Sequence, residues 1–355
     1  MLRIAPFVFL LLVTACAHAP AAPSPSGEVL ATPPALAEAR ASWVASTVRL
    51  ARTEVMQGRF ERARTLLESA LDRAAAEGDA AGEARLQAEL ALVLSEESFY
   101  TRADAERGIQ LAQAAQAAAH GQGALEVEAG AVHAEGFLRY GELLWAEGKD
   151  FHVPRERFAR ARELFRQVGD ASGVAQETFF LGLTEEQEGK PERAEPLYVE
   201  ARQRAEEIGD RPTQAYALRH LGGLAESRGD LDQALALQRR CLALREEIGQ
   251  VRLVPFALLA VGDLEKKKGA LTDARASYAR ALTLAEELDS APARFWSRFG
   301  LGAVDEAEGR LGPALENYQV AKRTAEQLGS KSWVEESAGA AERVRLRLGT
   351  AQGGG

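Results

Sequence analysis

Residues 178–209 read TFFLGLTEEQEGKPERAEPLYVEARQRAEEIG and contain six landmarks that return along the chain. These are an aliphatic residue with glycine, a turn glycine, a small residue, an aromatic residue, a second small residue and a closing glycine, at Leu181-Gly182, Gly189, Ala194, Tyr198, Ala201 and Gly209. The first landmark recurs every forty residues, at 221–222, 261–262 and 301–302. One period held over four units predicts a repeat protein, in which length does not count domains.

The repeat has few exceptions and extends upstream. Gln238 replaces the aromatic residue, Cys241 a small residue and Asp289 the closing glycine. The same frame fits 50–78, and it fits 140–169, around Tyr140-Gly141, with one residue inserted near Phe151. A unit over 90–121 is the weakest, and the helix after it, near 123–147, is expected to be about two turns longer than its counterparts.

Each unit is expected to form a helix, a turn and a second helix, because apolar residues recur at helical spacing on both sides of the turn glycine. Glycine ends the first helix, where a positive φ is cheap only for this residue. Asp170, Asp210 and Asp230 stand where helix N-caps are wanted. Gly182 and Ala194 stand where the two helices cross, and larger side chains there would push the helices apart.

This spacing resembles the tetratricopeptide repeat, in which Leu-Gly is followed by alanine, an aromatic residue and alanine at fixed distances. Residues 181–201 match that pattern without a gap. The family's early tryptophan, its following tyrosine and its terminal proline are replaced, the proline by glutamate at 206, 246, 286 and 326. A period of forty residues instead of the family's thirty-four implies helices longer by about one or two turns.

The resemblance covers about 36–330 and implies an all-α fold. That fold is a right-handed superhelical α-solenoid of about seven helix pairs, closed by a capping helix near 331–348 that contains Trp333 and Val344. Members of the family bind proteins or peptides. The resemblance therefore implies a binding protein that needs no cofactor and catalyses no reaction.

The N-terminus, MLRIAPFVFLLLVTAC, has the charge and the short apolar run of a signal peptide and is too short to span a bilayer. Its Val13-Thr14-Ala15-Cys16 resembles the bacterial lipobox, which implies cleavage before Cys16 and lipidation of its sulfur. Ala17 instead of aspartate favours the outer membrane by family analogy. The alternative is an ordinary secretory signal with a coincidental cysteine.

The predicted organisation follows from these segments. Residues 1–15 form a cleaved signal peptide, and residues 16–35 form the lipidated Cys16 with a tether rich in proline and alanine. The solenoid spans 36–349, and 350–355 form a disordered glycine-rich tail.

Composition and motifs argue against several function classes. A net charge of −9 disfavours non-specific binding to nucleic acid. HExxH, GxSxG and GxGxxG motifs are missing, and Gly141–Lys149 resembles a phosphate loop but has the wrong spacing, with Asp150 in place of serine or threonine. No histidine lies four residues from another histidine or a cysteine, and Cys241 is expected to be a buried, inert thiol. We therefore expect the protein to bind neither a nucleotide nor a metal ion and to catalyse no reaction.

A run of three lysines, Lys266-Lys267-Lys268, could bind an anion. The alternative is a ladder of charges between repeats, because Glu226, Lys266 and Glu306 share one repeat position. Such a ladder would stabilise the array only weakly and would carry no function.

The concave face of the solenoid is the candidate site, since the first helices line it in the family. Its positions lie six and three residues before the landmark glycine and one, four and five after it. The first set is Gln176, Tyr216, Phe256 and Trp296, and the second is Phe179, Arg219, Leu259 and Phe299. Three consecutive aromatic residues at one position would suit an amphipathic helix or an extended apolar peptide.

The alternative is that these rings pack between adjacent units as core. Phe179 and Leu183 occupy the positions at which the family's clamp for a C-terminal carboxylate has lysine and asparagine, so that ligand is not expected.

The sequence thus predicts a lipid-anchored scaffold or assembly factor that faces the periplasm at the outer membrane and binds a protein segment. The architecture is similar to that of pilotin lipoproteins, an analogy that concerns architecture alone. The alternative is a regulator that responds to a peptide.

Overall fold

The computed structural model describes residues 34–101, 105–145 and 150–352, and within them it contains fifteen α-helices and no strand. The helices are α1 (Pro34–Met56), α2 (Phe60–Ala76), α3 (Ala80–Thr101), α4 (Ala105–Gln122), α5 (Leu125–Trp145), α6 (His152–Gln167), α7 (Ala171–Gln187), α8 (Pro191–Ile208), α9 (Arg211–Ser227), α10 (Leu231–Glu247), α11 (Val254–Lys267), α12 (Leu271–Glu287), α13 (Ala291–Ala307), α14 (Leu311–Gln327) and α15 (Lys331–Gln352). The predicted signal peptide, Cys16 and most of the tether lie outside the described residues.

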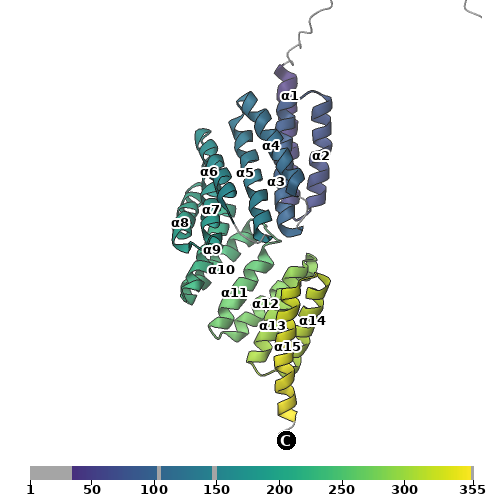
Figure 1. Cartoon of the computed structure of the whole chain (residues 1–355), viewed down its shortest axis with the longest axis vertical. Helices are drawn as coiled ribbons and strands as arrows, with labels where there is room; N and C mark the ends of the chain where they lie inside the picture. The colour runs from purple at the N-terminus through teal and green to yellow at the C-terminus, as the bar shows by residue number, and fades with distance from the viewer. Residues whose placement is uncertain (1–33, 102–104, 146–149, 353–355) are drawn as a thin grey trace, which may run out of the picture. The chain divides into compact units, whose positions relative to one another are not determined.

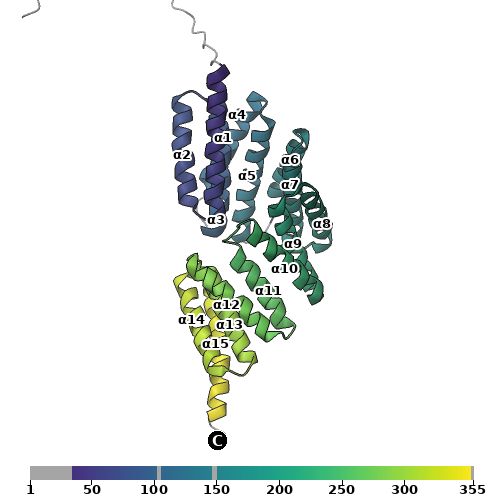
Figure 2. The same ribbon diagram turned by 180° about the vertical axis from the view of Figure 1, so that it is seen from behind.

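The described helices from Arg40 onward form one compact unit. Consecutive helices run antiparallel and side by side (Figure 1 and Figure 2), and each pair from α3 to α14 packs against the next. The predicted all-α solenoid of helix pairs with a last, unpaired helix is confirmed. No described helix has both the length and the apolar character needed to cross a membrane.

Two kinds of turn residue shape the repeat. Gly189 follows α7 with a φ of 73°, a conformation that strains other residues. Asp289, which replaces glycine at the end of α12, has a φ of 49°, and aspartate tolerates this region better than most side chains. The predicted caps are also present: Asp210, for example, accepts a hydrogen bond from the Thr213 amide at 3.1 Å.

The aromatic landmark fills the space between the two helices of a unit. Tyr198, Tyr278 and Tyr318 are among the largest fully buried side chains. A Cβ atom placed on Gly182 would come within 2.8 Å of the Tyr198 ring, so glycine is required where the helices cross. Packing of one ring against one glycine therefore explains the Leu-Gly signal.

The third unit follows a different landmark from the one predicted. The sequence placed its landmark at Tyr140-Gly141, but a Cβ atom on Gly141 would meet no other atom within 4 Å. Gly136 makes the close approach instead, at 2.9 Å from the Phe158 ring. With 21 residues, α5 is longer than α7 but shorter than α1 and α3, so the expectation of a helix two turns longer than its counterparts is wrong. The connection from α5 to α6 is longer than that from α7 to α8, so the forty-residue period selected the wrong turn of α5.

Two helix boundaries differ from the strict period. The period counted from Arg211 places the start of α11 at 251, but α11 begins at Val254. Its proline, Pro255, occupies the first turn, where proline is best tolerated, and the start of the helix moves with it. The last helix runs to Gln352, beyond its predicted end near 348 and beyond the predicted end of the solenoid at 349.

Candidate functional site

The first-helix face is defined by the predicted groove positions, six and three residues before the landmark glycine and one, four and five after it. Four of the predicted site residues on this face are half-buried: Tyr216, Phe256, Trp296 and Phe299. Arg219 is exposed, whereas Phe179 and Leu259 are buried, with 3% and 7% of their surface accessible. The side chains of Tyr216, Phe256 and Trp296 thus pack against the core and keep part of their surface accessible. This arrangement has elements of both interpretations, a ligand-binding row and core packing between units. Ligand binding by these residues stays a prediction.

An aromatic cluster joins α7, α8 and α9. The ring centroid of Phe179 lies 5.5 Å from that of Tyr198 and 5.7 Å from that of Tyr216. The His220 ring completes the cluster at 5.3 Å from Phe179 in an edge-on arrangement. Phe179 therefore holds Tyr216 in position rather than offering a surface of its own.

A chain of hydrogen bonds borders this cluster. The Tyr198 hydroxyl donates to Glu186 Oε2 at 2.5 Å, and His220 Nδ1 lies 2.7 Å from the same oxygen. Arg219 Nη1 lies 3.0 Å from His220 Nε2. Because a guanidinium can only donate, His220 Nε2 must accept and Nδ1 must carry the proton, which is the neutral tautomer of histidine.

The protonation states of His220 and Glu186 agree with the geometry of these hydrogen bonds. Burial lowers the pKa of His220, which keeps the ring neutral. Burial alone would raise the pKa of Glu186, but hydrogen bonds from His220 and Tyr198, with the charge of Arg219, lower it below its ordinary value. The carboxylate is thus charged and already shared between two donors.

The tyrosine–carboxylate contact recurs in later units. The Tyr278 hydroxyl donates to Asp263 at 2.6 Å, and the Tyr318 hydroxyl donates to Glu306 at 3.0 Å. Each contact ties a second helix to the first helix of its own unit. The unit of α9 and α10 lacks this contact, because Gln238 stands where its neighbours have tyrosine.

The triple lysine takes part in a ladder, but not in the predicted register. Lys267 rather than Lys266 forms the ion pair with Glu226, at 2.5 Å, and Lys266 pairs with Asp263 in its own helix at 3.2 Å. Lys268 pairs with Asp232. All three lysines have acidic partners, which favours the structural interpretation over an anion site.

Sequence reasoning missed a buried ionisable pair. His133 Nδ1 on α5 lies 2.6 Å from Glu177 Oε1 on α7, and both side chains are buried. The Phe158 and Phe180 rings stack at 4.9 Å, and His133 lies 5.0 Å from Phe180. Burial raises the pKa of Glu177. The only sequence signal for this buried pair was a glutamate inside an apolar stripe.

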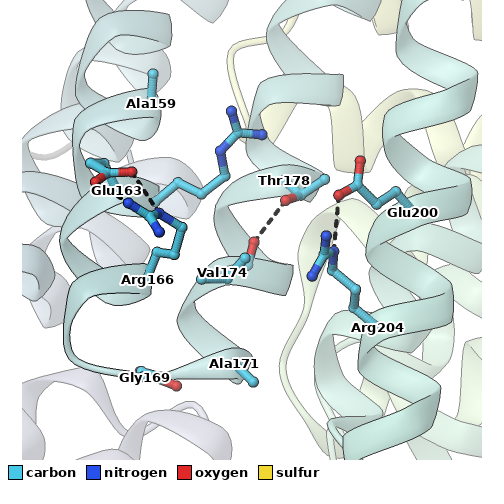
Figure 3. Close-up of a pocket in the computed structure, with 11 residues that line it drawn as sticks. Ala159, Glu163, Arg166, Gly169, Ala171, Val174, Thr178, Glu200 and Arg204 are labelled. Carbon is cyan, nitrogen blue, oxygen red and sulfur yellow. Dashed lines mark hydrogen bonds and ion pairs between the residues drawn. The ribbon is translucent and has the colours of Figure 1, made fainter.

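A shallow hollow of about 440 Å³ lies between α6, α7 and α8 (Figure 3). Two of its arginines pair within the hollow: Arg166 bonds to Glu163 at 2.7 Å, and Arg204 bonds to Glu200 at 2.9 Å. Arg162 also lines the hollow, which contains none of the predicted site residues. Among the described residues no group of three or more acidic, histidine or cysteine side chains could hold a metal ion.

Comparison with known proteins supports the fold. Residues 174–247, which include α9 and α10, match the family described as tetratricopeptide repeat. No match was found among curated proteins.

Solved structures resemble the chain over most of its length. A signal transduction ATPase with a tetratricopeptide repeat sensor from Pyrococcus horikoshii is 16% identical with a TM-score of 0.56, covering 83% of this chain and 43% of its own, so this chain spans less than half of that protein. The apo quorum sensor NprR from B. thuringiensis is 15% identical with a TM-score of 0.53, covering 86% and 87%. A Rap protein complexed with competence and sporulation factor is 12% identical with a TM-score of 0.50, covering 87% and 99%.

These likenesses show the fold. The protein is an all-helical repeat solenoid with a segment, residues 174–247, that matches the tetratricopeptide repeat. Its first-helix face is the candidate site.

Proposed function

We propose that this protein is a membrane-anchored scaffold that binds a segment of a partner protein on its first-helix face. The observation that carries the proposal is the row of half-buried aromatic side chains, Tyr216, Phe256 and Trp296, at one position of three consecutive units. Half-buried rings are held rigid by the core, so a ligand that covers their free edges would lose little conformational entropy. Assembly of an envelope complex is the role that this arrangement would serve.

The anchor is proposed from the lipobox at Cys16. Two or more acyl chains would hold the protein at a membrane, because burial of each CH₂ contributes about 0.8 kcal/mol. Cys16→Ser is expected to move the protein from the membrane fraction to the soluble fraction. A variant that stays in the membrane fraction would refute the anchor without touching the binding proposal.

Replacement of the aromatic row tests the binding face. Leucine at Tyr216, Phe256 and Trp296 keeps apolar packing but removes the rings, and the triple variant is expected to lose cross-linked partners identified by mass spectrometry. A control carries alanine at three exposed apolar residues of the second helices and their ends: Val168, Ile208 and Leu328. Equal retention of partners by both folded variants, verified by circular dichroism, would exclude this face.

A second candidate is a regulator that responds to a peptide. It is favoured by the chain of hydrogen bonds from Arg219 through His220 to Glu186, which links α9 to α7. A ligand that displaced Arg219 would thereby alter a contact between two units. Compaction on addition of a bound peptide, measured by X-ray scattering, would support regulation, whereas an unchanged profile would favour the scaffold.

A further inference from the structure

Apart from Arg219, the cations at the positions of the first-helix face are paired with carboxylates. The pairs are Arg52–Glu89 at 2.8 Å, Arg85–Glu126 at 3.1 Å, Lys266–Asp263 at 3.2 Å, Lys267–Glu226 at 2.5 Å and, on the last helix, Arg343–Glu306 at 3.3 Å. Arg219 differs, because no carboxylate of the described residues lies within ion-pair distance of it. A guanidinium without a direct ion pair in an otherwise paired row points to a partner that is supplied from outside.

The local contacts orient Arg219 without neutralising it. Its Nη1 donates to the neutral His220 ring, and Gln238 Nε2 donates to its backbone carbonyl at 2.9 Å. The nearby Glu186 carboxylate is occupied by Tyr198 and His220. The remaining N–H groups of Arg219 stay available for a planar, two-point contact with a carboxylate.

Apolar surface lies on both sides of Arg219 along the array. Tyr216 stacks against Phe179 of the preceding unit, and Phe256 packs on the core of the following unit. Tyr216 lies on α9 itself, three residues before Arg219, and Phe256 lies on α11, the first helix of the next unit. A segment whose acidic side chain meets Arg219 could therefore place apolar side chains over these two rings.

We propose that Arg219 recognises an aspartate or glutamate side chain inside an extended partner segment, flanked by apolar residues on both sides. The inference rests on the proposed binding face and adds the chemistry of its ligand. An internal residue fits better than a chain end, because the apolar surface continues on both sides and a single guanidinium supplies the charge.

The test is a selection of displayed random decapeptides on the immobilised full-length chain. Peptides enriched by the natural chain are expected to carry Asp or Glu at an internal position with apolar residues on both sides. For a selected peptide made synthetically with an amidated C-terminus, Arg219→Gln is expected to weaken binding about 10–100-fold, as expected for loss of a charge-assisted contact. Arg323→Gln, which removes an exposed arginine of α14 without an ion pair in the described residues, serves as the matched control and should leave binding unchanged.

The outcomes separate the two proposals. If no peptide is enriched, the binding face itself is wrong. If apolar peptides are enriched without acidic residues, or if Arg219→Gln binds as well as the Arg323→Gln control, the face stands and the role of Arg219 is overturned. Binding that requires a free C-terminal carboxylate also overturns it. Unfolding midpoints of both variants equal to that of the natural chain show that folding does not explain the result.

Discussion

Replacement of Gly300 by alanine is expected to destabilise the C-terminal units, because the neighbouring Tyr278 ring cannot move away from the added methyl group. A Cβ atom at this position would lie 2.5 Å from the Tyr278 ring, which is closer than such atoms can approach. The same ring faces Gly262, where a Cβ atom would lie at 2.9 Å, and its hydroxyl bonds to Asp263 at 2.6 Å. The ring is therefore confined between two first helices and fixed at its tip.

The magnitude follows from two opposing effects. Overpacking a buried site costs about 1–3 kcal/mol. Alanine is better than glycine inside a helix by roughly 0.5–1 kcal/mol. The two ranges leave a net loss of roughly 0–2.5 kcal/mol of unfolding free energy for Gly300→Ala, and a Cβ contact as short as 2.5 Å favours the upper part of this range. Gly223 is the matched control, because a Cβ atom there meets nothing within 4 Å, and Gly223→Ala should gain about 0.5–1 kcal/mol.

Urea unfolding followed by tryptophan fluorescence measures this effect, since Trp296 packs against the same core as Tyr278. The midpoint should fall for Gly300→Ala and rise for Gly223→Ala relative to the natural chain. A Gly300→Ala variant as stable as the Gly223→Ala variant would refute the argument that this contact sets the spacing between successive first helices.

Two further predictions concern capping and the tyrosine contact. Asp210→Ala should cost about 1 kcal/mol in urea unfolding through loss of the α9 cap, and an unchanged midpoint would count against it. Tyr198→Phe should cost about 1–2 kcal/mol by the same measurement, because Glu186 loses a donor, and a gain in stability would be inconsistent with that role.

The forty-residue periodicity of the sequence predicted most of the fold. The forty-residue spacing located the crossings at Gly182 and Tyr198 because these contacts are local, made within one helix pair. The caps at Asp170 and Asp210 were equally readable, since a cap depends on residues three apart at most. Where the connection lengthened after α5, the same counting selected Gly141 instead of Gly136.

The candidate site was only partly readable, because its contacts join different units. The sequence identified Tyr216 and Arg219 by repeat position, but Phe179 is buried beside Tyr216. The roles of His220 and of the His133–Glu177 pair depend on how neighbouring units pack, which no pattern within one unit determines. The exposure of each predicted site residue on the first-helix face could therefore be determined only from the structure.

Two departures from the repeat, Gln238 and Arg219, lie in the same unit, that of α9 and α10. Gln238 replaces the buried tyrosine of its neighbours and, instead of meeting a carboxylate, donates to the backbone of Arg219. Arg219 in turn stands where the neighbouring units have Phe179 and Leu259. Both substitutions give up apolar packing, and Gln238 Oε1 is buried without a hydrogen-bond partner in the described chain. Local choices that oppose the fold are expected mainly at functional positions, so these departures support the proposal that the unit of α9 and α10 binds the ligand.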